Sequence, residues 1–165
     1  MSRFYLSALI VCLMTIAFVQ STIRADSPRT RNFGTHLSGD NQPVPVETRA
    51  QGQAIFQLSK DGSRLYYKLI VANINDVFMA HIHLAPEGAN GPIVLWLYPN
   101  APPPLPIPGR FDGVLAEGTV TSADLVGPLA GMELEDLVVA MEEGLTYVNV
   151  HTLAFRPGEI RGQIR

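Results

Sequence analysis

The stretch GQAIFQLSKDGSRLYYKLIV, residues 52–71, has the pattern of a β-hairpin. Apolar residues recur at every second position on both sides of its centre: Ala54, Phe56 and Leu58 before it, and Leu65, Tyr67, Leu69 and Val71 after it. Such alternation is typical of strands that bury one face and expose the other. The Asp61-Gly62 pair between the two runs is a strong signal for a tight turn. The stretch therefore predicts two antiparallel strands that share one apolar face.

Four further segments have strand patterns, and one has a helical pattern. The strands are expected at residues 77–85, 92–98, 145–152 and 158–165. Alternation in the first of these places its residues on two faces: Phe78, Ala80, Ile82 and Leu84 on one, and Val77, Met79, His81 and His83 on the other. Residues 132–144 space their apolar side chains for a helix, and the proline-rich residues 99–113 predict a surface loop. Many strands and one helix predict a mainly β fold, an antiparallel sandwich with a short helical crossover.

The N-terminus has the three parts of a secretory signal peptide. Arg3 precedes an apolar run at residues 5–19, and QSTIRA then ends in a small residue. We expect a signal peptide at residues 1–25, cleaved after Ser21 or Ala25, then a flexible segment at 26–32 and one domain at 33–165. An uncleaved anchor is the alternative, although a membrane span needs roughly 20 apolar residues. The expected localisation is secreted or periplasmic.

Charge and cysteine content narrow the partners of the exported chain. Loss of Arg3 and Arg24 reduces the basic residues from 12 to 10 against 15 acidic ones, a formal net charge of −5. No basic block remains, so nucleic acid and anionic membrane surfaces are not expected partners. The single cysteine, Cys12, lies in the predicted signal peptide, so the exported domain has no disulfide and depends on burial of apolar surface.

Four segments, in the same order, resemble the CHRD domain, which is named after chordin and is common in exported bacterial proteins. They are LSGDNQPVPV at residues 37–46, the hairpin and His-x-His region at 52–97, GTVTSADLVGPLAGMELEDLVVAM at 118–141 and YVNVHTLAFRPGEIRGQI at 147–164. The resemblance covers residues 33–164 and implies an immunoglobulin-like or superoxide-dismutase-like β-sandwich in the extracytoplasmic space. It implies no reaction, because the family has no general assigned activity.

Three of the four histidines have the spacing of a metal site. His81 and His83 would project from one side of a strand, roughly 6.6–7 Å apart along the chain. His151 is expected on a neighbouring strand, on the face opposite Val148 and Val150. Three imidazoles would suit copper or zinc. The fourth histidine, His36, is expected on the surface.

A structural polar cluster is the alternative for the same histidines. Buried histidines often bond to loop backbone and fix the turn that follows. The loop PEGANG at residues 86–91 offers such partners, and Asn149, Glu159 and Arg161 are expected to form a supporting polar network. The spacing alone leaves both interpretations open.

Copper-zinc superoxide dismutases carry a similar His-x-His strand and a later strand histidine. That weaker resemblance implies copper ligation by His81, His83 and His151, with Arg161 as an anion-guiding residue. No histidine lies between His83 and His151, so a bridging ligand and zinc-loop ligands are missing, and a working dismutase is not expected.

The sequence shows no other catalytic constellation. It has no cysteine nucleophile in the exported part and no G-x-S-x-G motif. Trp96, Tyr98 and Tyr147 could line a pocket, although core packing is expected for Trp96. We therefore expect a non-enzymatic binding or structural module whose partner is an extracytoplasmic protein or small ligand, and the alternative is a protein that binds copper or zinc.

Overall fold

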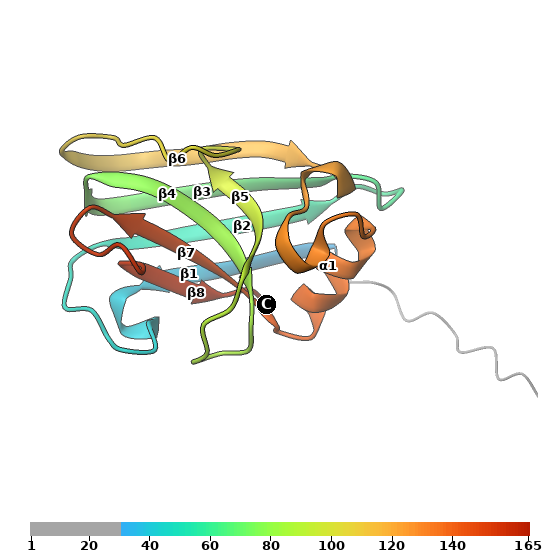
Figure 1. Cartoon of the computed structure of the whole chain (residues 1–165), viewed down its shortest axis with the longest axis horizontal. Helices are drawn as coiled ribbons and strands as arrows, with labels where there is room; N and C mark the ends of the chain where they lie inside the picture. Colours follow the sequence, from blue (N-terminus) through green and yellow to red (C-terminus); the bar gives the residue numbers. More distant parts are fainter. Residues whose placement is uncertain (1–30) are drawn as a thin grey trace, which may run out of the picture.

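The computed structural model describes residues 31–165 as a mainly β molecule with one α-helix (Figure 1). Its eight strands follow in chain order: β1 (Asn32–Ser38), β2 (Gln51–Leu58), β3 (Leu65–Asn75), β4 (Val77–Leu84), β5 (Ile93–Tyr98), β6 (Arg110–Val120), β7 (Thr146–Thr152) and β8 (Ile160–Gln163). The helix and three short 3-10 turns complete the fold: η1 (Gly39–Asn41), η2 (Ser122–Asp124), η3 (Gly127–Leu129) and α1 (Leu134–Glu142). The predicted mainly β class is confirmed. The predicted signal peptide lies outside the described residues.

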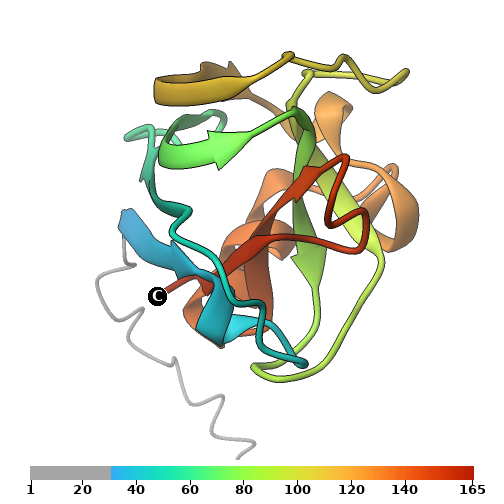
Figure 2. The ribbon, with the colours of Figure 1, turned by 90° about the vertical axis from the view of Figure 1, so that its left-hand side faces the viewer.

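All eight strands form one antiparallel sheet that curls until its edges approach each other (Figure 2). The strand order is β5-β4-β7-β8-β1-β2-β3-β6, so β5 and β6 are the edges. Near this seam the hydroxyl of Tyr67 on β3 donates to the carbonyl oxygen of Leu97 on β5 at 3.0 Å. Leu95 of β5 also pairs with Leu125, which follows β6. The sheet is therefore nearly closed, and its two halves pack like the layers of a sandwich.

One apolar cluster fills the space between these layers. It contains the residues that alternate along the predicted hairpin: Ala54, Phe56, Leu58, Leu65, Tyr67, Leu69 and Val71. The two strands pair antiparallel as predicted, and Leu58 lies opposite Leu65 across the turn. Burial of each large apolar side chain contributes about 1.5–3 kcal/mol. Residues 31–165 contain no cysteine, so this burial carries most of the stability of the domain.

The helix α1 covers one end of the sheet (Figure 1). Its apolar positions are the predicted ones, and Leu134, Leu137, Val138 and Met141 are all buried. At the N-terminus the carboxylate of Asp136 accepts a hydrogen bond from the backbone N–H of Glu133 at 3.0 Å. The helix is followed by Gly144 at a φ of +67°, a conformation that glycine adopts without strain.

A β-bulge in β4 places two residues on the faces opposite to those predicted. The pairing of β4 with β7 shifts between Val77 and Met79. As a result Val77 joins the core with Ala80, whereas the ring of Phe78 lies 6.3 Å from that of His151 on the outer face. The prediction was wrong at residues 77 and 78, because an extra residue in one strand interrupts the alternation of side chains.

Two strands were not predicted. β1 pairs with β2 along its whole length, and β6 pairs with β3. The loop predicted at residues 99–113 therefore ends at Gly109, because β6 begins at Arg110.

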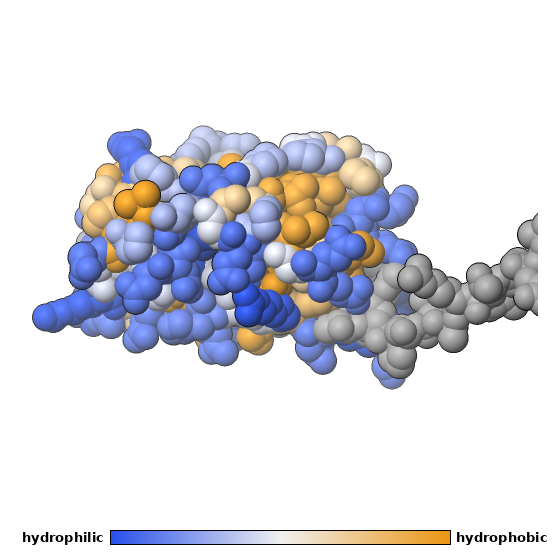
Figure 3. Space-filling model, turned by 90° about the horizontal axis from the view of Figure 1, so that it is seen from below, coloured by the Kyte–Doolittle hydropathy of each residue, from blue (hydrophilic) through white to orange (hydrophobic). Residues whose placement is uncertain are grey.

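Hydrophilic residues predominate on the face shown in Figure 3, and a hydrophobic area lies in the half that contains α1. The exposed large apolar side chains come from separate elements and loops, among them Val44, Ile55, Leu105, Val139 and Leu153. Within residues 31–165, no helix has the length and apolar character that crossing a membrane requires.

Candidate metal centre

The pairing of β4 with β7 brings His81, His83 and His151 together on the outer face of the sheet. His151 lies opposite Met79, and the other two histidines lie further along β4 on the same face. The ring centroids are 5.6 Å apart for His81 and His83, 5.2 Å for His81 and His151, and 5.9 Å for His83 and His151. One ring nitrogen from each histidine lies within 4.8 Å of the other two. The structure thus brings together the three histidines that the sequence singled out.

Loops cover this cluster, so it is buried although it lies outside the apolar core. His81 is 0% exposed, His151 4% and His83 8%. Residues 85–92 and the loop after β7 supply backbone acceptors to two of the rings. His36, by contrast, is exposed on β1 as predicted.

Two backbone carbonyls determine which nitrogens can bind a metal. The Nδ1–H of His83 donates to the carbonyl oxygen of Gly91 at 2.9 Å, and the Nδ1–H of His151 donates to that of Arg156 at 2.8 Å. A carbonyl oxygen can only accept, so the proton of each neutral ring is on Nδ1 and Nε2 carries a lone pair. Ligating histidines are commonly oriented in this way by a second hydrogen bond.

His81 presents Nδ1 to the cluster, whereas His83 and His151 present Nε2. Its Nδ1 lies 3.4 Å from Nε2 of His151. Because Nε2 of His151 is an acceptor, the proton of this contact belongs to Nδ1 of His81 in the metal-free protein. Among the described residues, the buried Nε2 atoms of His81 and His83 have no hydrogen-bond partner. Most buried polar atoms in proteins are paired. The lone pair on Nε2 of His83 is therefore available to an ion, whereas the nitrogen that His81 presents to the cluster is Nδ1.

The surroundings keep all three imidazoles neutral. Burial, followed by the neighbouring His151 and His83, lowers the pKa of His81 to about 3. Burial also lowers the pKa of His151 to about 4 and lowers that of His83, which Arg161 lowers further. Neutral imidazole is the form that binds metal ions.

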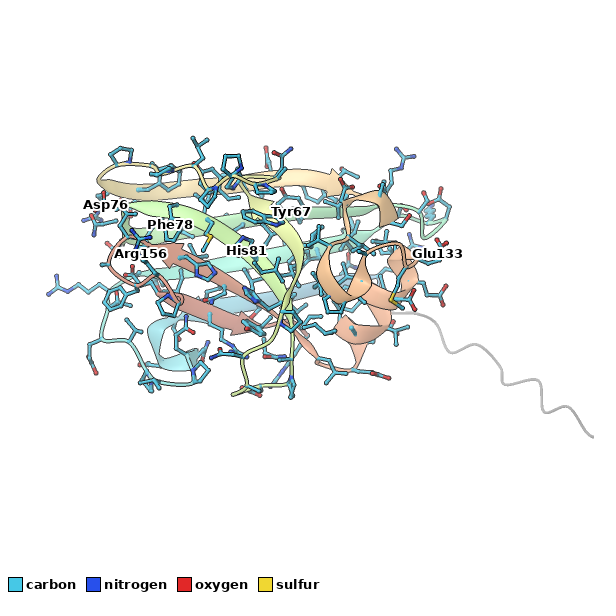
Figure 4. The ribbon with its side chains drawn as sticks, viewed as in Figure 1. Tyr67, Asp76, Phe78, His81, Glu133 and Arg156 are labelled. Carbon is cyan, nitrogen blue, oxygen red and sulfur yellow. The ribbon has the colours of Figure 1, made fainter. Side chains whose placement is uncertain are left out.

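Aromatic rings form the walls of the cluster. Trp96 of β5 packs edge-to-face against His81, with centroids 4.2 Å apart and planes at 86°. Tyr147 stacks on His83 at 4.9 Å and 8°, and Phe78 packs against His151. Phe78, His81 and Arg156 are labelled in Figure 4, which shows them on this side of the sheet. The prediction of core packing for Trp96 was wrong, because its side chain lies on the histidine face and is only partly buried.

Arg161 holds the covering loop in place. Its guanidinium is 1% exposed and lies 3.4 Å above the centroid of the Tyr147 ring. It donates to the carbonyl oxygen of Ala89 at 2.9 Å and, at 3.4 Å, to that of Pro86 and to Oδ1 of Asn90. A guanidinium that is buried and bonded in this way does not face solvent, so the implied anion-guiding role does not fit Arg161.

Asn149 and Glu159 are also buried, and their hydrogen bonds lead to loops. The amide of Asn149 accepts from Gln42 at 2.8 Å and donates to the carbonyl oxygen of Pro157 at 3.0 Å. The carboxylate of Glu159 accepts from the hydroxyls of Thr48 at 2.6 Å and Thr152 at 2.7 Å. Within the described chain neither residue bonds to a histidine, so they support the loops around the cluster.

The arrangement fits a transition-metal ion. Two ligands at bonds of 2.0–2.1 Å can be at most about 4.2 Å apart. The 3.4 Å between Nδ1 of His81 and Nε2 of His151 satisfies this limit. All three ligand atoms lie within 4.8 Å of one another, so side-chain movements of about half an ångström would bring every pair within this limit. The cluster can therefore offer three neutral nitrogen ligands to one ion.

Sequence reasoning expected the loop at residues 86–91 to supply backbone partners to the histidines, and Gly91 of that loop does so for His83. It missed Arg156, whose carbonyl oxygen leaves no signal in side-chain patterns. Gly91 does have a steric signature, because a Cβ at this position would lie 1.9 Å from the carbonyl oxygen of Leu84. Only glycine allows the loop to approach β4 so closely.

Comparison with known proteins supplies a family but no characterised relative. A search of curated proteins and a search of solved structures each found no significant match. The family model of the CHRD domain matches residues 33–164, a region that contains α1, all three histidines and nearly the whole sheet. Because this match covers most of its length, the chain belongs to the CHRD-domain family.

Proposed function

We propose that this protein is an exported, non-enzymatic module that binds one copper or zinc ion through His81, His83 and His151. The observation that carries the proposal is the convergence of three buried, neutral imidazoles, of which His83 has a ligand nitrogen without a partner. An ion at their centre would bind the lone pairs of His83 and His151 and replace the proton between His81 and His151.

A purely structural cluster explains less of the geometry. Such a cluster would be expected to pair Nε2 of His83, since leaving a buried nitrogen unpaired costs about 1–3 kcal/mol. The hydrogen bonds of His83 and His151 to backbone carbonyls satisfy only their Nδ1 atoms and orient the Nε2 atoms toward the cluster. This orientation is the one that ligating histidines adopt.

The closed environment favours binding over catalysis. The three side chains are at most 8% exposed, and Arg161 is bonded to the covering loop. A substrate would need both an open coordination position and a path to it. The predicted signal peptide and the family membership support export, and N-terminal sequencing of the protein from the extracytoplasmic fraction tests this part.

Metal analysis of the purified protein tests the proposal. The protein is loaded separately with Cu⁺ under reducing anaerobic conditions, with Cu²⁺ and with Zn²⁺, freed of loose metal by gel filtration and analysed for metal content. The expected result is one ion per chain. The variants H83N and H151N should lose it, because asparagine keeps an N–H donor near the position of Nδ1 but lacks Nε2.

The fourth histidine provides the matched control. His36 is exposed and outside the cluster, so H36N should retain full metal content. Circular dichroism and thermal unfolding establish that each variant is folded. A folded wild-type protein that retains no copper or zinc, or folded cluster variants that retain as much as the wild type, would exclude the proposed site and leave a structural role for the histidines.

A further inference from the structure

We propose, on the basis of the proposed metal site, that the three histidines select monovalent copper and bind it with three ligands: Nδ1 of His81, Nε2 of His83 and Nε2 of His151. Three independent features of the cluster support this choice. They are the enclosure of the histidines by aromatic rings, the positive sign of the surrounding charge, and the protonation of Nδ1 in His83 and His151, which leaves a lone pair on each ligand nitrogen.

Aromatic rings surround the three histidines on several sides. Trp96, Tyr147 and Phe78 pack against the three rings at centroid distances of 4.2, 4.9 and 6.3 Å. Cavities on the described surface, with volumes of about 220 to 540 Å³, are lined by residues other than the three histidines. The three histidines are therefore largely shielded from solvent, with exposed fractions of at most 8%.

Coordination preference then distinguishes the candidate ions. Zinc is almost always four-coordinate in proteins, and divalent copper prefers a square or tetragonal arrangement of ligands. Monovalent copper has a filled d shell, as zinc does, but carries half the charge, and it is stable with only two or three ligands. Three imidazoles enclosed by aromatic rings satisfy it without water.

The charges around the cluster also favour a monovalent ion. The guanidinium of Arg161 lies behind Tyr147, and that of Arg156 lies 5.7 Å from the ring centroid of Phe78. The nearby acids are engaged elsewhere, since Glu87 pairs with Arg165 and Glu159 with two threonines. Three neutral ligands would leave the whole charge of the ion uncompensated. The desolvation free energy of an ion rises with the square of its charge, so burying a divalent ion costs about four times as much as burying a monovalent one.

Binding requires no net release of protons. The rings of His83 and His151 already carry their protons on Nδ1, where the carbonyl oxygens of Gly91 and Arg156 accept them. Only His81 must change tautomer: its proton moves from Nδ1 to Nε2, and Nδ1 becomes a ligand. No redox step is involved when copper is supplied in the monovalent state.

Competition experiments with the purified protein test this inference. Under anaerobic conditions, Cu⁺ is titrated against a chromophoric Cu⁺ chelator, and Zn²⁺ against a chromophoric zinc chelator. The single tryptophan of the chain packs against His81, so its fluorescence reports occupancy directly. We expect Cu⁺ to bind about a thousandfold more tightly than Zn²⁺, and X-ray absorption to show three nitrogen ligands at about 2.0 Å.

Exposure of the copper-loaded protein to air supplies a second readout. An enclosed three-coordinate site should keep copper monovalent and silent in electron paramagnetic resonance. The variant W96A, which would open one wall, should oxidise faster and show a four- or five-coordinate Cu²⁺ signal. If Zn²⁺ binds as tightly as Cu⁺, or if copper bound to the wild-type protein has four ligands, the inference of a three-coordinate Cu⁺ site is overturned. The proposal that the three histidines bind a metal ion would remain. If no ion binds at all, both proposals are overturned.

Discussion

At the scale of single residues, the neutral histidines predict that acid destabilises the metal-free protein. The pKa of His81 is about 3 in the folded state and that of His151 about 4, whereas an unfolded histidine has a pKa of about 6.5. Between these values only the unfolded chain takes up protons, so the free energy of unfolding falls as pH decreases below about 6.5. Each such histidine contributes a slope of about 1.4 kcal/mol per pH unit.

Denaturant unfolding of the metal-free protein at several pH values from 7.5 to 4.5 measures this slope. The H151N variant should show a smaller slope, because one of the groups that becomes protonated on unfolding is gone. The H36N variant should keep the wild-type slope, since His36 lies outside the cluster. A wild-type stability that does not change between pH 7 and 5 would contradict the assignment of neutral buried rings.

Gly91 offers a second prediction at this scale. The substitution G91A would place a Cβ 1.9 Å from the carbonyl oxygen of Leu84, so the loop must move away and the hydrogen bond from His83 must lengthen. We expect a loss of about 1–3 kcal/mol in the free energy of unfolding and weaker metal binding. Gly88 lies in the same loop, with a φ of +78° and open space around it. The G88A variant should therefore show only backbone strain of about 1 kcal/mol and near-normal metal binding.

The sequence predicted the ligands of the candidate site better than their surroundings. His81, His83 and His151 follow from strand alternation, because alternation depends only on side-chain spacing. The bulge that places Phe78 on the same face could not be predicted from alternation, because it depends on how β4 pairs with β7. The carbonyls that orient the rings belong to loops, where side-chain patterns carry little information.

At the scale of elements, the prediction succeeded where one face is continuously buried. β2 alternates buried and exposed residues along its full length, and the adjoining turn has a recognisable sequence. β6 shows why others were missed: only Leu115 and Val120 of its eleven residues are buried, and two register shifts interrupt its pairing with β3. At Gly118 the ring of Tyr67 packs against the backbone, so this position has no side chain that could indicate a strand.

The helix α1 allows a matched test of burial within one element. Leu137 is 0% exposed and belongs to the core, whereas its near neighbour Val139 is 36% exposed. We expect L137A to reduce the free energy of unfolding by about 2–5 kcal/mol, through lost burial and the cavity that remains. The V139A variant should change it by less than about 0.5 kcal/mol. Chemical denaturation of both variants checks this, and equal effects would show that α1 does not pack as described.

At the scale of the whole molecule, a single side chain links the last strand to the loop that covers the cluster. Arg161 extends from β8 across Tyr147 of β7 to the carbonyl oxygens of the loop between β4 and β5. Since Gly91 of that loop orients His83, the sheet, the loop and the candidate ligands form one connected unit. Stability and metal affinity should therefore change together when this link is removed.

Arg161 and Arg165 provide the comparison that tests this connection. The R161A variant would leave the carbonyl oxygen of Ala89 without its donor and remove the stacking on Tyr147. We expect a loss of about 1–3 kcal/mol in the free energy of unfolding and at least tenfold weaker metal binding. Arg165 pairs with Glu87 at the surface, where both side chains are 71% exposed, and R165A should cost less than about 1 kcal/mol. R161K is the milder variant, which keeps the charge and most of the side-chain volume but cannot reproduce the planar contacts. Metal affinity that is normal in a folded R161K protein, with the covering loop unchanged by hydrogen exchange, would show that the histidines are oriented independently of this arginine.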